Sequence, residues 1–154
     1  MDAVDRRLVD ALRGNARASY AELARHVGLS APSVHERVGK LESSGVIRGY
    51  HASVAPEALG YAISSLIGIF LTDTADVNHV EGELTASAAV EDCWFVAGEE
   101  SFVIKVRVPD VGSLEHLIGS LNAITGVART RTTVVLSTKF EARVPGPSIE
   151  PDVF

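Results

Sequence analysis

The fold of the N-terminal part is decided by the stretch SYAELARHVGLSAPSVHERVGKL (residues 19–41). Ser19 is suited to cap a short helix, which Gly28 ends. Ser30 then caps a longer helix, with Pro32 in its first turn, where a missing backbone N–H costs nothing. A short helix, a glycine-containing turn and a longer capped helix are the pattern of a helix-turn-helix.

The longer helix has an apolar side and a polar side. Val34, Val38 and Leu41 recur at i, i+4 and i+7 and predict a buried stripe. We expect polar residues outside this stripe to face DNA. One group is expected to contact base edges, and a second group, of cations, is expected to contact phosphates. The first group is Ser33, His35 and Glu36, the second is Arg37, Lys40 and Arg48, and Ser30 at the start of the helix completes the predicted DNA-binding set.

The flanking sequence extends this domain in both directions. Val4, Leu8 and Leu12 lie at helical spacing and predict a preceding helix that Gly14 ends. After Gly45, residues 46–54 become roughly alternating and predict an extended strand, which is broken around Pro56 and Gly60.

The second part of the chain has a different periodicity. Strands are expected near residues 65–71, 91–97, 102–108 and 127–140, with helices after the first and third of them. This is the βαββαβ order of a ferredoxin-like sandwich, so the fold class is α+β. The expected domains are the helix-turn-helix over 1–53, a linker over 54–62, the ferredoxin-like domain over 63–143 and a flexible tail over the proline-rich residues 144–154.

Runs of consecutive apolar residues in this sheet indicate that both of its faces are buried. Leu66-Ile67 and Val134-Val135-Leu136 are such runs. Helices cover only one face of this fold, so we expect the other face to be covered by a second copy of the chain in a C2 dimer. The alternative is a hydrophobic sheet with one face partly exposed.

The net charge of −6 argues at first against a nucleic-acid partner, since cations supply most of the non-specific affinity. The charge is uneven, however: residues 1–60 carry a net +1 and residues 61–154 a net −7. This distribution is expected if only the first part approaches DNA. The longest apolar run, residues 66–71, is far shorter than the roughly 20 residues of a membrane span, so a cytoplasmic protein is expected.

Other classes of site find little support. Cys93 stands alone and the five histidines lie far apart, so we expect neither a disulfide nor a metal site. Ser101, Asp110 and His116 form no recognisable nucleophile, base and orienting group, although sequence alone leaves open that they meet in space. We therefore expect no enzyme and no cofactor.

The chain resembles the leucine-responsive and asparagine-responsive (Lrp/AsnC, or feast/famine) transcription regulators over residues 2–143. Several motifs carry the resemblance together, and no single one would. They are DAVDRRL (2–8), ASYAELA (18–24), VGLS (27–30), RVGKLESSGVIRGY (37–50), VAGEESF (96–102), RVPD (107–110), GV (126–127) and TRT (130–132).

The resemblance implies a winged-type helix-turn-helix joined to a ferredoxin-like domain that dimerises, assembles into octamers or similar rings, and binds a small effector, usually an amino acid, between dimers. The residues that match the effector site are Gly98, Glu99, Glu100 and Ser101 in a loop, and Thr130, Thr132 and Val134 on the last strand. Without the resemblance, the sequence of this loop predicts only a solvent-exposed hairpin turn.

The chain departs from the family at three positions. Glu36 and Gly39 stand where relatives commonly carry arginine or lysine, which suggests that affinity comes from several half-sites engaged at once. Gly39 alternatively permits close packing of a neighbouring segment. Ser101 replaces a common aspartate, so Glu99 or Glu100 meets an amino group instead, or the effector differs.

The function expected from the sequence is a sequence-specific DNA-binding transcriptional regulator whose assembly and DNA binding respond to a small effector, in particular an amino acid. Its expected partners are double-stranded DNA, the amino acid and further copies of itself, without a membrane. The alternative is an amino-acid-sensing module that acts on a partner protein without specific DNA binding.

Overall fold

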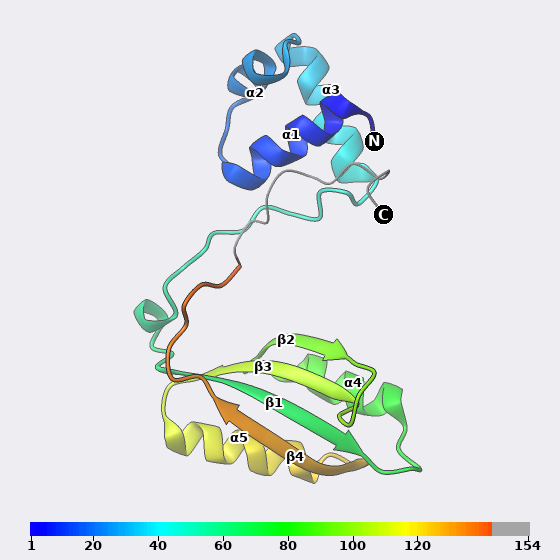
Figure 1. Ribbon diagram of the computed structural model, residues 1–154, viewed down its shortest axis with the longest axis vertical. Coiled ribbons are helices and arrows are strands. Elements are labelled where there is room, and N and C mark those ends of the chain that lie inside the picture. The colour runs from blue at the N-terminus through cyan, green and yellow to red at the C-terminus, as the bar shows by residue number, and fades with distance from the viewer. Residues whose placement is uncertain (143–154) are drawn as a thin grey trace. The chain divides into compact units, whose positions relative to one another are not determined.

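The computed structural model describes residues 1–142. Residues Met1–Ser53 and residues Val54–Lys139 belong to two separate compact units (Figure 1). The tail expected over 144–154 lies outside the described residues, as does residue 143 of the second expected domain. Each unit has a hydrophobic core of its own.

The first unit consists of three helices, α1 (Ala3–Gly14), α2 (Tyr20–Val27) and α3 (Ala31–Ser43). Their polar caps fix where each begins: the N-caps are Asp2, Ser19 and Ser30. Gly28 ends α2 in the left-handed region, with φ +76°, which favours glycine. The predicted helix-turn-helix is therefore confirmed, together with its preceding helix.

The core of this unit lies where the three helices meet. Leu8 of α1 and Val34 of α3 are fully buried, and Val38 is 1% exposed. The other members of the cluster are Leu12, Leu23, Ala24 and Val27. The stripe predicted for α3 is thus its buried side, which leaves the rest of that helix to solvent.

The strand predicted over residues 46–54 is wrong. These residues form no strand, because no neighbouring strand within the unit offers hydrogen bonds. Val46, Tyr50 and Val54 stay about half exposed. Residues 46–51 instead line a shallow hollow beside Val9 and Leu12 of α1.

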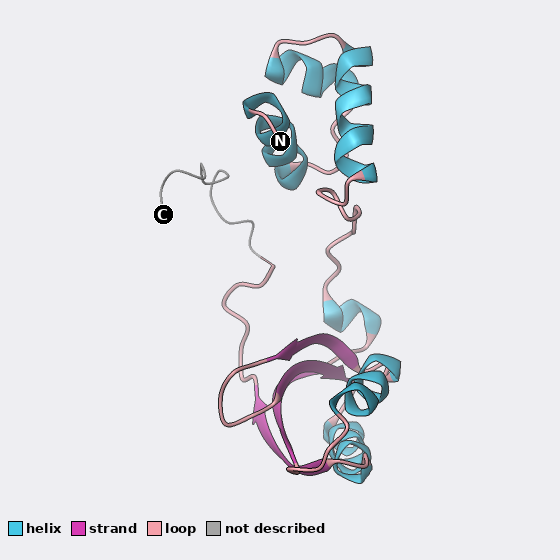
Figure 2. Cartoon of the chain, turned by 90° about the vertical axis from the view of Figure 1, so that its right-hand side faces the viewer, coloured by secondary structure: helices cyan, strands magenta, loops and turns pink. Residues whose placement is uncertain are grey.

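The second unit begins with a short 3-10 helix, Pro56–Leu59, which ends at Gly60 with φ +86°. Its elements then follow as β1 (Ile63–Leu71), α4 (Val77–Ala86), β2 (Val90–Phe95), β3 (Phe102–Val108), α5 (Val111–Ala123) and β4 (Val127–Val134). The antiparallel sheet has the order β2-β3-β1-β4, and both helices cover the same face of it (Figure 2). The expected ferredoxin-like architecture is confirmed.

The last strand is shorter than the predicted residues 127–140. It pairs with β1 as far as Val134, and Val135 N still donates to Ser64 O at 2.9 Å. The partner strand begins at Ile63, so beyond this point no backbone remains to pair with. Leu136, expected inside, is 96% exposed.

The two faces of the sheet differ sharply. Ile67, Ile69, Phe102 and Ile104 face the helices and are at most 2% exposed. On the other face Leu66 is 40% exposed; Trp94 of β2, opposite Val103, is 46% exposed. A single chain leaves this open face uncovered, and its predicted cover by a second copy stays a prediction.

Within residues 1–142, no helix is both long enough and apolar enough to cross a bilayer.

Candidate DNA interface and effector site

The exposed side of α3 is the candidate DNA interface. Glu36, Gly39, Lys40 and Ser43 are all exposed and lie opposite the buried Val34. The predicted residues of α3 are placed together: Ser30 accepts from Ser33 N at 3.3 Å, and their hydroxyl oxygens lie 2.8 Å apart. Arg48 lies beyond the helix and is also exposed.

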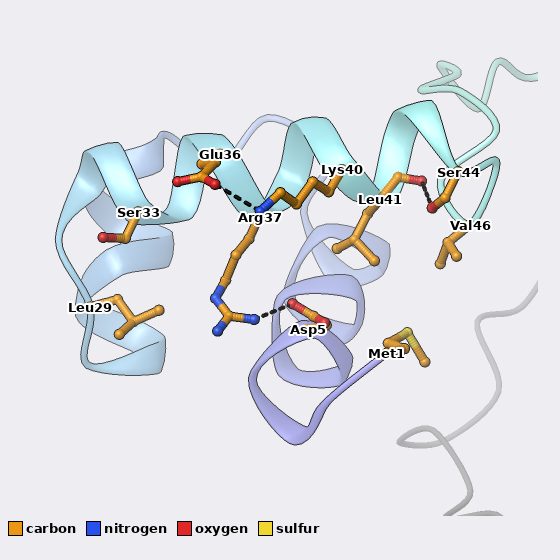
Figure 3. A pocket seen from close by; sticks show the side chains of 10 residues that line it. All are labelled: Met1, Asp5, Leu29, Ser33, Glu36, Arg37, Lys40, Leu41, Ser44 and Val46. Carbon is orange, nitrogen blue, oxygen red and sulfur yellow. Dashed lines mark hydrogen bonds and ion pairs between the residues drawn. The ribbon is translucent and has the colours of Figure 1, made fainter.

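A groove of about 550 Å³ runs beside α3, between this helix and the start of α1 (Figure 3). Ser33, Glu36, Arg37 and Lys40 contribute its α3 wall, and Asp5 faces them from α1. The groove therefore has acidic and basic groups on facing elements.

Arg37 bridges this groove. Its Nη1 donates to Asp2 Oδ2 and to Asp5 Oδ1, both at 2.7 Å. The Arg37 side chain is 35% exposed, and that of Asp5 17%. The pKa of Asp2 is lowered by the backbone hydrogen bond from Asp5 and by the Arg37 guanidinium, and the same ion pairs raise the pKa of Arg37.

Lys40 has a different environment. Its Nζ lies 2.7 Å from Glu36 Oε1, one turn away on the same helix, and both side chains are at least 70% exposed. The hydrogen bond and charge of Lys40 lower the pKa of Glu36. Exposed pairs at this spacing contribute little stability, so this cation is easily released to a phosphate.

Aromatic rings lie along the other flank of α3. The His35 ring meets Tyr20 at the start of α2 edge-on, with centroids 4.9 Å apart. Tyr50 Oη donates to Glu42 Oε1 at 2.9 Å. Burial, followed by this carboxylate, raises the pKa of Tyr50 to about 12, so the phenol stays a donor at neutral pH.

Gly39 has no packing role within the described chain. No neighbouring segment among residues 1–142 lies within 4 Å of a Cβ added at this position. Replacing Gly39 with alanine is therefore expected to stabilise the first unit by about 0.5–1 kcal/mol, because alanine has the higher helix propensity. Urea unfolding followed by circular dichroism at 222 nm measures this change.

The matched control is Gly28→Ala, which should destabilise the same unit because Gly28 has φ +76°. If Gly39→Ala also destabilises it, the glycine has a structural role that the described contacts do not contain.

Several interface residues were missed in the sequence. Asp2 and Asp5 lie 35 and 32 positions from Arg37, and no periodicity links residues at such separations. Tyr20 was not among the predicted interface residues, because its position against His35 depends on how α2 packs on α3.

The predicted effector loop joins β2 to β3. Gly98 and Glu99 are exposed, whereas Glu100 and Ser101 are partly buried. Ser101 N donates to Ile69 O at 2.9 Å, and Val96 N donates to Ser101 O at 3.0 Å. The backbone of Ser101 thus fixes the end of the loop on β1.

The remaining predicted effector residues lie on the helix-covered face of the sheet. Thr130 is paired with Ile69, and Thr132 with Ile67. Directly opposite residues share a face, and Ile67 and Ile69 face the helices. Val134 pairs with Ser65 on that same face. Within one chain, the structure therefore does not bring this set together with Glu100.

Glu100 instead forms a charged cluster on the open face. Its carboxylate forms an ion pair with Arg131 of β4, and its Cγ would lie 2.7 Å from a Cβ added at Gly68. Arg129 stacks on the ring of Phe70, 3.3 Å from the ring centroid. The absence of a side chain at Gly68 lets Glu100 cross β1.

Sequence reasoning missed these two arginines because they alternate with the threonines of β4. The alternation of arginines and threonines could be recognised in the sequence. Whether the arginines or the threonines face the loop depends on the register of β4 with β1. Within residues 1–142, no group of three or more His, Cys, Asp or Glu is placed to hold a metal ion.

The first unit is a helix-turn-helix with an exposed third helix, and a ferredoxin-like unit follows it in sequence. This combination is that of a DNA-binding regulator with a ligand-binding domain. Residues 1–42 match the AsnC-type helix-turn-helix domain, and residues 64–145 match the Lrp/AsnC ligand binding domain. The chain belongs to the Lrp/AsnC family of transcriptional regulators.

Its relatives agree with this assignment along nearly the whole chain. The HTH-type transcriptional regulator LrpA of Mycobacterium tuberculosis is 40% identical over 143 residues, which cover 93% of this chain and 95% of LrpA. The regulatory protein AsnC of Escherichia coli K12 is 36% identical over 137 residues, covering 88% and 90%.

A solved structure of the feast or famine regulatory protein from M. tuberculosis, complexed with L-methionine, has a TM-score of 0.88 to this chain. It is 40% identical, and the match covers 94% of this chain and 97% of that one. The predicted class, a transcriptional regulator and not an enzyme, is that of the family and of these relatives.

Proposed function

We propose that this regulator binds specific DNA sites through α3 and that an α-amino acid, bound by its second unit, changes that binding. The observation that supports the DNA-binding part is the exposed side of α3, which presents Ser33, His35, Glu36 and Lys40 together. As a DNA-binding regulator, the protein is proposed to act in the cytoplasm.

In the proposed complex, two copies place their α3 helices in successive major grooves about 34 Å apart. Ser33, His35 and Glu36 meet base edges, and the edge-on contact with Tyr20 restrains the His35 ring. Lys40 and Arg48 hold phosphates. The sequence also predicted a phosphate contact for Arg37, but its guanidinium donates to Asp2 and Asp5 instead.

The proposed dimer forms through the open face of the sheet, where Leu66 and Trp94 are exposed. Burying them against a second copy removes apolar surface from water. We also propose that dimers assemble further into octamers, as the resemblance to the family implies. Sedimentation of the unaltered protein and of Leu66→Glu tests this: the variant should become monomeric, and an unchanged mass would contradict the proposed face.

The proposed effector is an amino acid, because the M. tuberculosis relative was solved with L-methionine. Glu99 or Glu100 would meet its ammonium group, near Gly98 and Ser101. Thr130, Thr132 and Val134 lie on the other face of the sheet, so contact with both sets is most simply made by two copies. This arrangement would couple ligand binding to assembly.

A thermal-shift screen over the twenty amino acids tests the effector. An amino acid that binds the folded protein raises the unfolding temperature by mass action. At least one, with L-methionine as the first candidate, should do so and also change the affinity for DNA. If none changes either quantity, the amino-acid part of the proposal fails.

A gel shift at low salt, with the protein's own upstream region as the probe, tests the DNA-binding part. Specific retardation is expected. Its absence would favour the alternative, an amino-acid-sensing module that acts on a partner protein.

Gly68→Ala is expected to abolish the stabilisation by the amino acid without unfolding the second unit. The new methyl group must displace Glu100, whose Cγ would lie 2.7 Å from it, and so break its ion pair with Arg131. The thermal shift with L-methionine measures the response. Gly119→Ala, where the added carbon meets nothing within 4 Å, is the control. An unchanged response in Gly68→Ala would show that the Glu100 position is not required.

A further inference from the structure

The guanidinium of Arg37 is held by two carboxylates that are themselves fixed. Asp2 Oδ1 accepts from Asp5 N at 2.8 Å, and Asp5 Oδ2 accepts from Asp2 N at 3.0 Å, which closes a capping box at the start of α1. The other oxygen of each carboxylate accepts from Arg37 Nη1. Every carboxylate oxygen of this cluster therefore has a donor.

This cluster connects two elements that are far apart in sequence. Asp2 is the N-cap of α1, Asp5 lies in its first turn, and Arg37 lies in the middle of α3. The groove lies between the start of α1 and this flank of α3, and the Arg37 side chain spans it to reach Asp5 (Figure 3). The ion pairs thus fix the distance across the groove.

We infer that Arg37 is a positioning residue, which locks α3 against the first turn of α1 through Asp2 and Asp5, and that it is not a phosphate ligand. The inference rests on the proposed DNA binding by α3. It also assigns Asp2 and Asp5, two acidic residues, a supporting role in binding an anionic partner.

A phosphate would have to displace both carboxylates to reach Arg37. It would exchange two charge-assisted hydrogen bonds for contacts to a single group, and it would leave the partly buried Asp5 without its cation. Lys40 faces no such cost, because its single partner Glu36 is 70% exposed on the same helix. Of the two, Lys40 is the cation that DNA can recruit.

Asp5→Asn separates the two roles by the sign of its effect. If Arg37 positions α3, losing the charge of Asp5 weakens the contact between α3 and the start of α1. DNA binding then becomes weaker by about tenfold, although the protein becomes less acidic. If Arg37 is a phosphate ligand, Asp5→Asn frees it and tightens binding. Fluorescence anisotropy with a labelled duplex of the protein's own upstream region measures the change.

The salt dependence of the same binding gives a second readout. Each phosphate contact contributes about 0.9 to the slope of log K against log salt. Arg37→Gln should weaken binding and leave the slope unchanged, whereas Lys40→Gln should reduce it by about 1 per protomer bound. Arg37→Gln combined with Asp5→Asn should be no weaker than Arg37→Gln alone, because both changes break the same contact.

Folding is followed separately in the two units. Circular dichroism at 222 nm reports all the helices, and the fluorescence of Trp94, the only tryptophan, reports the second unit. Arg37→Gln should lower the transition of the first unit by roughly 5 °C and leave the Trp94 transition in place. Should Arg37→Gln fail to fold, Arg37→Lys replaces it: a positioning role predicts weakened binding with an unchanged slope, since lysine cannot reproduce both contacts.

Tighter binding by Asp5→Asn, unchanged binding by this variant, or a reduced slope for Arg37→Gln or Arg37→Lys would each overturn the inference while leaving the proposed function intact. If the unaltered protein does not bind the duplex specifically, the proposed function fails, and the inference with it.

Discussion

Leu8→Ala should strongly destabilise the helix-turn-helix unit and so weaken DNA binding. Leu8 is fully buried in a cluster of seven buried residues. Truncating a buried leucine to alanine costs about 2–5 kcal/mol, because the apolar contact is lost and a cavity remains. A domain of this size has only about 3–8 kcal/mol of stability, so the loss is a large part of the total.

Circular dichroism at 222 nm should show the first unit unfolding at a much lower temperature, while the Trp94 fluorescence transition of the second unit stays where it is. Leu29→Ala is the control, since Leu29 is 36% exposed in the same unit and its truncation should cost far less. A Leu8→Ala protein as stable as Leu29→Ala would contradict the described core.

Phe102→Ala should have the corresponding effect on the second unit. Phe102 is 2% exposed within the cluster formed by the sheet and its two helices. The loss of a buried phenylalanine costs about 3–5 kcal/mol. Because β3 lies between β2 and β1, a cavity here weakens both strand pairs, and the response to an amino acid should disappear with the unit's packing.

Trp94 fluorescence against urea measures this loss. Phe95→Ala is the matched control: Phe95 is 67% exposed and meets Phe102 edge-on at 5.1 Å, so its truncation removes the ring contact without opening a cavity in the core. Retention of the unfolding midpoint in Phe102→Ala would show that the sheet does not depend on this side chain.

Most of the fold could be predicted because its signals are local. Ser19, Gly28 and Ser30 mark the ends of α2 and the start of α3 through their own backbone hydrogen bonds, and Val34, Val38 and Leu41 mark the buried stripe. The predictions that were wrong depended on strand partners. Residues 46–54 have the composition of a strand but no neighbour to pair with, and β4 ends where β1 begins.

The candidate sites divide in the same way. The exposed residues of α3 follow from its buried stripe and could be located from the sequence. The environments of Arg37 and Glu100 could not, because Asp2, Asp5 and Arg131 reach them only through helix packing and strand register. A charged side chain is visible in a sequence, whereas its partner is a property of the fold.

The most direct test of a DNA-binding regulator that responds to an amino acid is the ratio of its affinities for its own upstream region and for a random duplex, at one salt concentration, with and without the stabilising amino acid. The predicted result is a preference of about 10³-fold or more for the upstream region. The amino acid should change that affinity by about 5- to 150-fold. Equal affinities for the two duplexes, or an affinity that no amino acid changes, would contradict the account.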